Sequence, residues 1–262
     1  MSLASARLRA LSGGFRLGLR TLRSTGDYLM PLAVVPFTTL VLVTVFAHGG
    51  RRDLSGTAFL APALMGLWAM SLYVAGETVD SDRSVGILEP ALATPAGLGA
   101  AVVGRVLAVN LVGTASFAES WSVAAVAGGR APTVAHPFVF AAALLATVTA
   151  MAGAALFMAA VFVLARSARI FQNSLSYPFY LLSGVVVPIT LLPRAVRPLS
   201  RLVFLSWSAD LLRAATAAGR PTHAGPALLG IAATGGGLAC AGGLALRAVS
   251  RRVRTTGTAS WA

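Results

Sequence analysis

Six apolar runs, each long enough to cross a membrane as a helix, constrain this chain of 262 residues more than any other feature. A helix needs about 20 apolar residues to span the hydrocarbon core of a bilayer. One charged residue, Glu119, interrupts these runs. The sequence therefore predicts an all-α integral membrane protein with six transmembrane helices. The expected spans are residues 28–47, 57–75, 106–129, 137–165, 170–193 and 224–246.

The charge composition excludes several function classes. Charged residues make up 11% of the chain, against about a quarter in soluble proteins. All 21 basic residues are arginine, which we interpret as the codon bias of a bacterium with a GC-rich genome. Without a lysine the chain cannot form the phosphate-binding P-loop of an ATPase, so we expect it to bind no cofactor. We interpret "LSGGF" at residues 11–15, which copies a signature of ABC ATPases, as coincidence.

The positions of the arginines predict the orientation and the partners. They flank the apolar runs, as in membrane proteins that mark their cytoplasmic side, so we expect lipid and no nucleic acid as a partner. Thirteen arginines lie inside and eight outside when both termini are placed in the cytoplasm. This favours a multi-pass protein of the cytoplasmic membrane, with a short cytoplasmic tail at residues 255–262.

Two segments outside the spans have features of interfacial helices. Residues 1–27 carry leucines and Phe15 at helical spacing with arginines between them, which predicts an amphipathic helix on an anionic leaflet or, alternatively, a disordered basic tail. The outer connection, residues 191–222, carries a stripe of Arg194, Arg197 and Arg201. A helix start at Ser208 and an i,i+3 pair of Asp210 and Arg213 predict two short outer helices there.

Prolines and small residues modify the last two spans. Pro178, Gly184 and Pro188 indicate that the fifth span either kinks or turns back. Gly235, Ala239 and Gly243 form a small-residue face on the sixth span. That face fits close packing within the chain or against a second chain.

The excursion between the second and third spans, residues 76–103, concentrates the scarce negative charge. Four of the eight acidic residues fall within it. Leu88 and Leu92, at i,i+4, could insert an apolar edge into a groove on a soluble partner, with acids facing basic residues around it. The alternative is a solvated acidic loop. The acidic residues are Glu77, Asp80, Asp82 and Glu89.

The same excursion carries a family resemblance. "GETVDSDRSVGILEPALATPAGLGAAVVGRVL" resembles the cytoplasmic signature of ABC-2 type transporter permeases, and residues 181–215 resemble the family's fifth span and outer re-entrant helices. Pro90 departs from the family pattern by interrupting the usual Leu-Glu helix, and Phe204-Leu205 replaces a proline-containing turn. The matching positions are Glu77, Arg83, Gly86, Leu88, Glu89, Leu92, Thr94, Pro95, Gly104 and Arg105.

The resemblance implies a six-span permease domain, residues 28–254, that is itself no enzyme. It implies a dimer with an identical or related permease chain and a separate ABC ATPase subunit, which would hold ATP and Mg. The segment around Arg83 to Pro95, which includes Gly86, would be a coupling helix that receives the ATPase movement, and Glu77, Asp80 and Asp82 before it would belong to the same coupling surface. The implied activity is efflux of an amphiphilic drug, lipid or natural product, as in exporters that confer antibiotic resistance.

Four residues within the spans are the candidates for a transport path, and Glu119 is the charged one among them. Glu119 could contact a cationic substrate, or it could be a buried structural carboxylate near the outer interface. Asn110, Tyr180 and Pro188 complete the candidate path. The three histidines are too scattered to predict a metal site. Two other functions remain open: a membrane enzyme that uses Glu119 with a histidine, and a scaffold that transports nothing.

Overall fold

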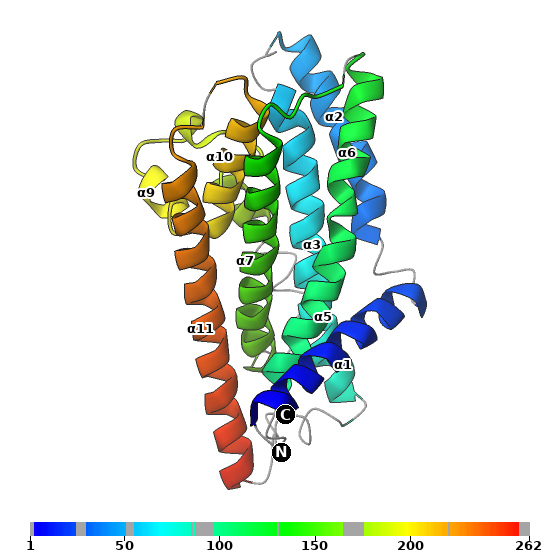
Figure 1. Cartoon of the computed structure of the whole chain (residues 1–262), viewed down its shortest axis with the longest axis vertical. Coiled ribbons are helices and arrows are strands. Elements are labelled where there is room, and N and C mark those ends of the chain that lie inside the picture. The colour runs from blue at the N-terminus through cyan, green and yellow to red at the C-terminus, as the bar shows by residue number, and fades with distance from the viewer. Residues whose placement is uncertain are drawn as a thin grey trace.

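The protein is a bundle of long helices. The computed structural model describes residues 3–24, 30–50, 55–84, 86, 97–129, 131–164, 176–219 and 221–256. The regular elements of these residues are all helical, which confirms the predicted all-α class (Figure 1). They are α1 (Leu3–Ser24), α2 (Met30–His48), α3 (Ser55–Ser84), α5 (Gly97–Gly113), α6 (Ala115–Ala127), α7 (Pro137–Leu164), the 3₁₀ turn η3 (Ile189–Leu191), α9 (Arg197–Ser200), α10 (Phe204–Thr216) and α11 (Ala224–Thr256).

Four stretches of the described helices are long and apolar enough to cross a membrane. They are Met30–His48, Gly99–Ala127, Pro137–Phe162 and Ala224–Ala248, and they match the first, third, fourth and sixth expected spans. The apolar part of α3, Gly56–Leu72, matches the second span but is shorter. The first part of the fifth expected span, residues 170–175, lies outside the described residues; the rest of it begins with a helical stretch at 176–182.

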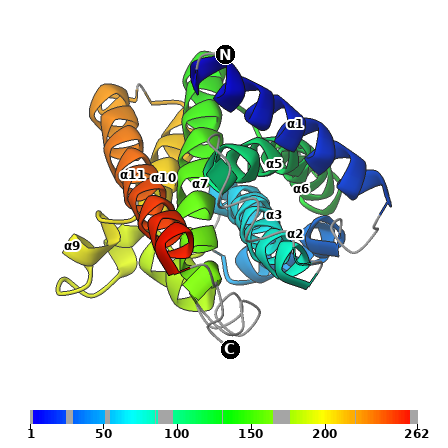
Figure 2. The same cartoon turned by 90° about the horizontal axis from the view of Figure 1, so that it is seen from below.

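The long helices stand side by side, and the chain crosses the bundle repeatedly from end to end (Figure 1). Helix α1 lies obliquely across the lower end, where the last turns of α11 also lie (Figures 1 and 2). Helices α9 and α10 lie toward the opposite end. We call the end with α1 the α1 end, and the other the α10 end.

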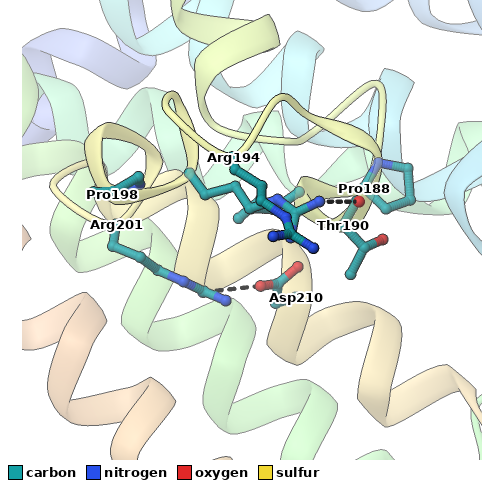
Figure 3. Close-up of a pocket in the computed structure, with 8 residues that line it drawn as sticks. Pro188, Thr190, Arg194, Pro198, Arg201 and Asp210 are labelled. Carbon is teal, nitrogen blue, oxygen red and sulfur yellow. Dashed lines mark hydrogen bonds and ion pairs between the residues drawn. The ribbon is translucent and has the colours of Figure 1, made fainter.

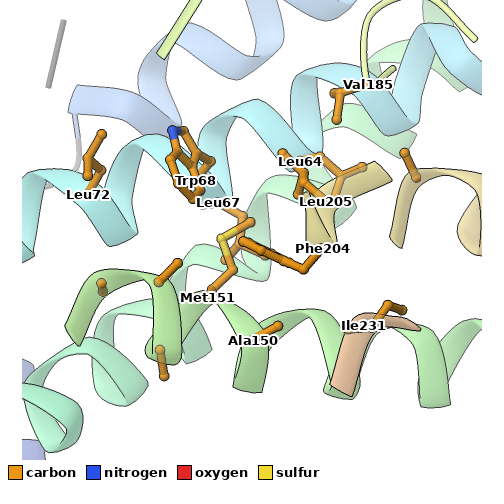
Figure 4. Packing of buried hydrophobic residues seen from close by; sticks show 14 of the residues in the cluster. Leu64, Leu67, Trp68, Leu72, Ala150, Met151, Val185, Phe204, Leu205 and Ile231 are labelled. Carbon is orange, nitrogen blue, oxygen red and sulfur yellow. The ribbon is translucent and has the colours of Figure 1, made fainter. Parts of the chain in front are cut away.

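Helix α3 is the centre of the bundle. Its residues from Thr57 to Leu72 are buried almost without interruption, and it packs against α2, α5, α6, α7 and α10. Leu64, Leu67 and Trp68 of α3 face Met151 of α7 and Phe204 of α10 across this core (Figure 4). A helix that is apolar on all sides is expected in such a central position.

Small residues allow α7 and α11 to approach closely. A Cβ atom on Gly153 of α7 would lie 2.5 Å from the carbonyl oxygen of Gly235 and 3.1 Å from the Cβ of Ala239. A Cβ on Gly242 would lie 2.5 Å from the backbone nitrogen of Phe157. The small-residue face predicted on the sixth span therefore packs within the chain. Gly235 and Ala239 contact α7 as members of this face, but the third small residue against α7 is Gly242 and not Gly243.

The N-terminal segment forms a helix, so the alternative of a disordered tail is wrong for residues 3–24. Gly14 and Gly18 of α1 are buried against α5, and a Cβ on Gly14 would collide with the carbonyl oxygen of Ala101. A Cβ on Gly104 of α5 would likewise collide with the carbonyl oxygen of Leu11. The glycines of "LSGGF" thus include one that packs two helices together. Arg9, Arg16, Arg20 and Arg23 are exposed on the other side of α1.

Substituting Gly235 with alanine should destabilise the protein, although alanine is ordinarily the better helix former. The added methyl would collide with Ala150, and overpacking of this kind costs about 1–3 kcal/mol. Gly236→Ala is the matched control, because a Cβ there meets nothing within 4 Å. Thermal unfolding in detergent should show a lower midpoint for Gly235→Ala alone; equal midpoints would contradict the close packing of α7 on α11.

Candidate functional site

The helical stretch at residues 176–182 ends in a glycine turn. The amide of Gly184 donates to the carbonyl of Leu181 (3.2 Å), and the amide of Val185 donates to that of Tyr180 (3.3 Å). Gly184 has φ +70°, a left-handed conformation that favours glycine at a helix end. The chain then continues into η3 and α9. The fifth span was expected either to kink or to turn back. The described residues show that its helix ends at Gly184.

Arg213 of α10 caps this helix end. One guanidinium nitrogen, Nη2, donates to the carbonyl oxygens of Gly184 and Val185, the latter at 2.9 Å. The same side chain pairs with Asp210 one turn earlier (3.2 Å), which confirms the predicted i,i+3 pair. Burial lowers the pKa of Arg213 and the Asp210 carboxylate opposes this shift, so the guanidinium stays charged.

Asp210 also joins α10 to the loop before it. Its second oxygen accepts from Arg201 at 2.9 Å, an ion pair that Figure 3 shows. The guanidinium of Arg201 lies 4.6 Å from the ring centroid of Trp207, and the Trp207 indole donates to the carbonyl of Arg201 at 2.9 Å. Arg197 donates to the carbonyls of Thr190 (2.7 Å) and Leu192 (3.0 Å). These bonds hold the outer connection together.

A pocket of about 470 Å³ lies within this connection. We call it the arginine pocket. Three of its residues are basic and one is acidic, so its lining has a net positive charge. It is lined by Pro188, Ile189, Thr190, Arg194, Arg197, Pro198, Arg201 and Asp210 (Figure 3).

The predicted start of an outer helix at Ser208 is wrong. Helix α10 begins at Phe204, and the Ser208 hydroxyl donates to the carbonyl of Phe204 (3.1 Å) inside the helix rather than capping an end. Serine is common at both kinds of position, so its presence did not mark the boundary. Phe204 and Leu205, which replace the family's proline turn, are fully buried as the first residues of α10.

The stretch 176–182 docks on α3 through aromatic side chains. The rings of Phe179 and Trp68 stack with centroids 4.2 Å apart, and Phe204 of α10 lies 6.1 Å from Trp68. The Tyr180 hydroxyl donates to the carbonyl of Met65 at 3.2 Å. Tyr180 therefore has a packing role, in addition to its predicted place on a transport path.

The other candidate path residues occupy separate places. Asn110 is fully buried, and its side-chain amide donates to the carbonyl of Val148 on α7 (3.5 Å). Glu119 on α6 is partly exposed, and its Oε2 atom is buried without a hydrogen-bond partner among the described residues. Pro188 lines the arginine pocket. The four candidates thus do not share one pocket in the described part of the chain.

The coupling segment begins as a continuation of α3. The helix runs on from Leu72, the end of its apolar part, to Ser84, about 18 Å at 1.5 Å per residue. Glu77, Asp80, Asp82 and Arg83 therefore lie on helical backbone, where the sequence suggested an excursion from Gly76. Gly86 follows in a turn with φ +73°. Leu88, Glu89, Leu92 and Pro95 lie outside the described residues.

The architecture defines a polytopic, all-helical membrane protein. The family model for ABC-2 type transporters matches residues 15–216, from α1 to the last turn of α10. The chain belongs to the ABC-2 type transporter family, and it is therefore the membrane subunit of an ABC transporter, a class that works with an ABC ATPase. No curated protein sequence matches the chain.

Asp210→Asn should destabilise the α10 end of the protein. The neutral amide would leave the guanidinium of Arg213, 16% exposed, without its ion-pair partner, at a cost of about 1–3 kcal/mol. Arg201→Gln removes the more exposed partner of Asp210, so we expect a change within about 1 kcal/mol. Unfolding midpoints of the two variants test this order. A larger loss for Arg201→Gln would show that Arg213 does not depend on Asp210.

Proposed function

We propose that this chain is the permease of an ATP-driven exporter and that an ATPase subunit docks on residues 76–103. The observation that carries the proposal is the extension of α3 beyond its apolar part at the α1 end. The extension places the backbone of three acidic residues, Glu77, Asp80 and Asp82, beyond the apolar stretch. A helix is a rigid connection, so a displacement of this extension reaches the buried centre of the bundle directly.

The packing around the extension supports a route for the movement. Residues 76–103 include the end of α3 and the start of α5, two helices that lie against each other, and α1 packs closely on α5 at Gly14, Gly18 and Gly104. A partner that binds this segment would therefore act on α1, α3 and α5 together. This is a proposal about coupling, and the experiment below addresses its first step, docking.

The proposal includes orientation and assembly. The α1 end, with the arginines of α1 and the last turns of α11, faces the cytoplasm in agreement with the positive-inside rule, and the protein lies in the cytoplasmic membrane. Two permease chains, identical or related, form the transporter. Exposed apolar residues along α2, among them Met30, Phe37 and Val41, offer a surface for lipid or for the second chain.

The substrate that we propose is an amphiphilic drug, lipid or natural product, moved outward. The support is the apolar character of the described spans, with few charged side chains among them. Glu119 is a candidate contact for a positively charged group on such a substrate. Its carboxylate forms no ion pair with the described arginines of the outer connection, of which Arg201 and Arg213 pair with Asp210.

Replacing Leu88 and Glu89 with arginine should abolish docking of the ATPase. The changes remove the apolar edge and reverse the charge of the surface that we propose to face basic residues. Co-purification of the co-expressed ATPase, and its ATP turnover in the complex, should both fall by at least about tenfold. Thr133→Arg adds an arginine at an exposed position of the α10 end and should leave both unchanged. Undiminished recovery of the ATPase by the double variant would refute docking at this segment.

Glu119→Gln tests the proposed substrate contact. A charge contact predicts that transport of cationic compounds falls about tenfold while the thermal midpoint stays unchanged, because the amide keeps the shape of the side chain. Transport of an uncharged compound by the same vesicles is the internal control. Normal transport together with a lower midpoint would assign Glu119 a structural role.

A further inference from the structure

The lining of the arginine pocket carries more positive charge than the carboxylate within it can neutralise. Its lining includes three guanidinium groups and one carboxylate, and that carboxylate, Asp210, already pairs with Arg201 and Arg213. Both of its oxygens are therefore occupied by guanidinium groups. An anion that entered the pocket would meet an unbalanced positive charge.

Three arginines of the connection have identifiable structural roles, and a fourth does not. Arg213 caps the helix end at Gly184, Arg197 binds two carbonyls of its own loop, and Arg201 pairs with Asp210. Arg194 is exposed at the pocket and has no hydrogen bond or ion pair among the described residues. Its side chain is available for a ligand.

The size of the pocket exceeds what a small ion requires. A volume of about 470 Å³ lies in the range of about 300–1,000 Å³ that is typical of sites for small molecules. Pro188, Ile189 and Pro198 contribute apolar surface to the same lining. The pocket therefore suits a molecule that carries an anionic group on a larger body.

Exposed apolar side chains surround this connection. Leu191, Leu199 and Leu202 are 52%, 55% and 72% exposed. They belong to η3, to α9 and to the turn after α9, the elements that enclose the pocket. Trp207, next to Arg201, is of the residue type enriched at the headgroup level of membranes. Leucines beside an arginine-lined pocket match a ligand with an anionic head and apolar chains.

We propose that the arginine pocket binds the headgroup of an anionic phospholipid, with the acyl chains against the exposed leucines. Arg194 donates to the phosphate oxygens, because a guanidinium presents two parallel N–H groups that match a phosphate. Arg201 and Arg197 add positive charge from positions that their structural contacts fix. The site thus anchors the α10 end to the lipid, and it requires no ATPase, so its test is independent of the proposed function.

The test is a titration of purified protein in neutral detergent with phosphatidylglycerol, followed by thermal unfolding. The lipid should raise the midpoint of the parent chain and give an apparent dissociation constant. Arg194→Gln should weaken that constant roughly tenfold, as expected for loss of a charged hydrogen bond. Arg194→Lys, which keeps the charge but loses the planar fork, should weaken it less. Without lipid, the midpoints should be equal because Arg194 has no described partner.

Controls separate the site from general attraction of anions. Arg247→Gln removes an exposed arginine of α11 and should leave lipid binding unchanged. Leu202→Ser should weaken binding of phosphatidylglycerol but not of glycerol 3-phosphate, which lacks acyl chains. Phosphatidylcholine, whose phosphate is offset by a cationic group, should bind at least about tenfold more weakly.

Two results would overturn the proposal. Equal affinity of Arg194→Gln and the parent chain for phosphatidylglycerol would show that the lipid binds elsewhere. Inorganic phosphate or glycerol 3-phosphate that binds as tightly as phosphatidylglycerol would show that the pocket takes a free phosphate and not a lipid.

Discussion

The structure depends on satisfying a helix end that lies buried in an apolar bundle. An unpaired carbonyl at a buried helix end costs free energy. The end at Gly184 is capped by the guanidinium of Arg213, a half-buried charge that pairs with the carboxylate of Asp210. Asp210 also forms an ion pair with Arg201 of the preceding loop. One buried helix end thus accounts for three of the charged residues in the outer connection: Arg213, Asp210 and Arg201.

Elsewhere the bundle is held by close contact between small residues. Apolar helices gain little by association when the surrounding lipid is equally apolar, so packing depends on backbone approach. Gly153 and Gly235 bring α7 against α11, and Gly14 and Gly104 bring α1 against α5. In each pair an added Cβ would collide with backbone or Cβ atoms of the other helix. One of these glycines, Gly14, belongs to the stretch at residues 11–15 that imitates an ATPase signature, and there it packs α1 on α5.

The sequence predicted those features that follow from local pattern. Hydropathy gave the helical class and the helices at four expected spans, and the i,i+3 spacing gave the pair of Asp210 and Arg213. The sequence could not predict that Arg213 binds the carbonyl of Gly184, because the two residues are 29 positions apart and meet only after the chain folds back. Helix boundaries were also missed: α3 continues past Gly76, where the excursion between the second and third spans was expected to begin, and α10 begins before Ser208.

Two features of the described bundle bear on how its helices can move relative to one another. Residues 176–182, α3 and α10 are joined by the stacked rings of Trp68 and Phe179 and by the cap of Arg213, so a relative shift would break several contacts at once. The third span is interrupted at Thr114, between α5 and α6. There the amide of Phe117 donates to the carbonyl of Thr114 at 3.0 Å, a tighter i,i+3 turn. Bending of this span at Thr114 would have to keep α6 on α3, because the hydroxyls of Ser116 and Ser120, just after the break, donate to the carbonyls of Ala63 (2.9 Å) and Phe59 (2.7 Å).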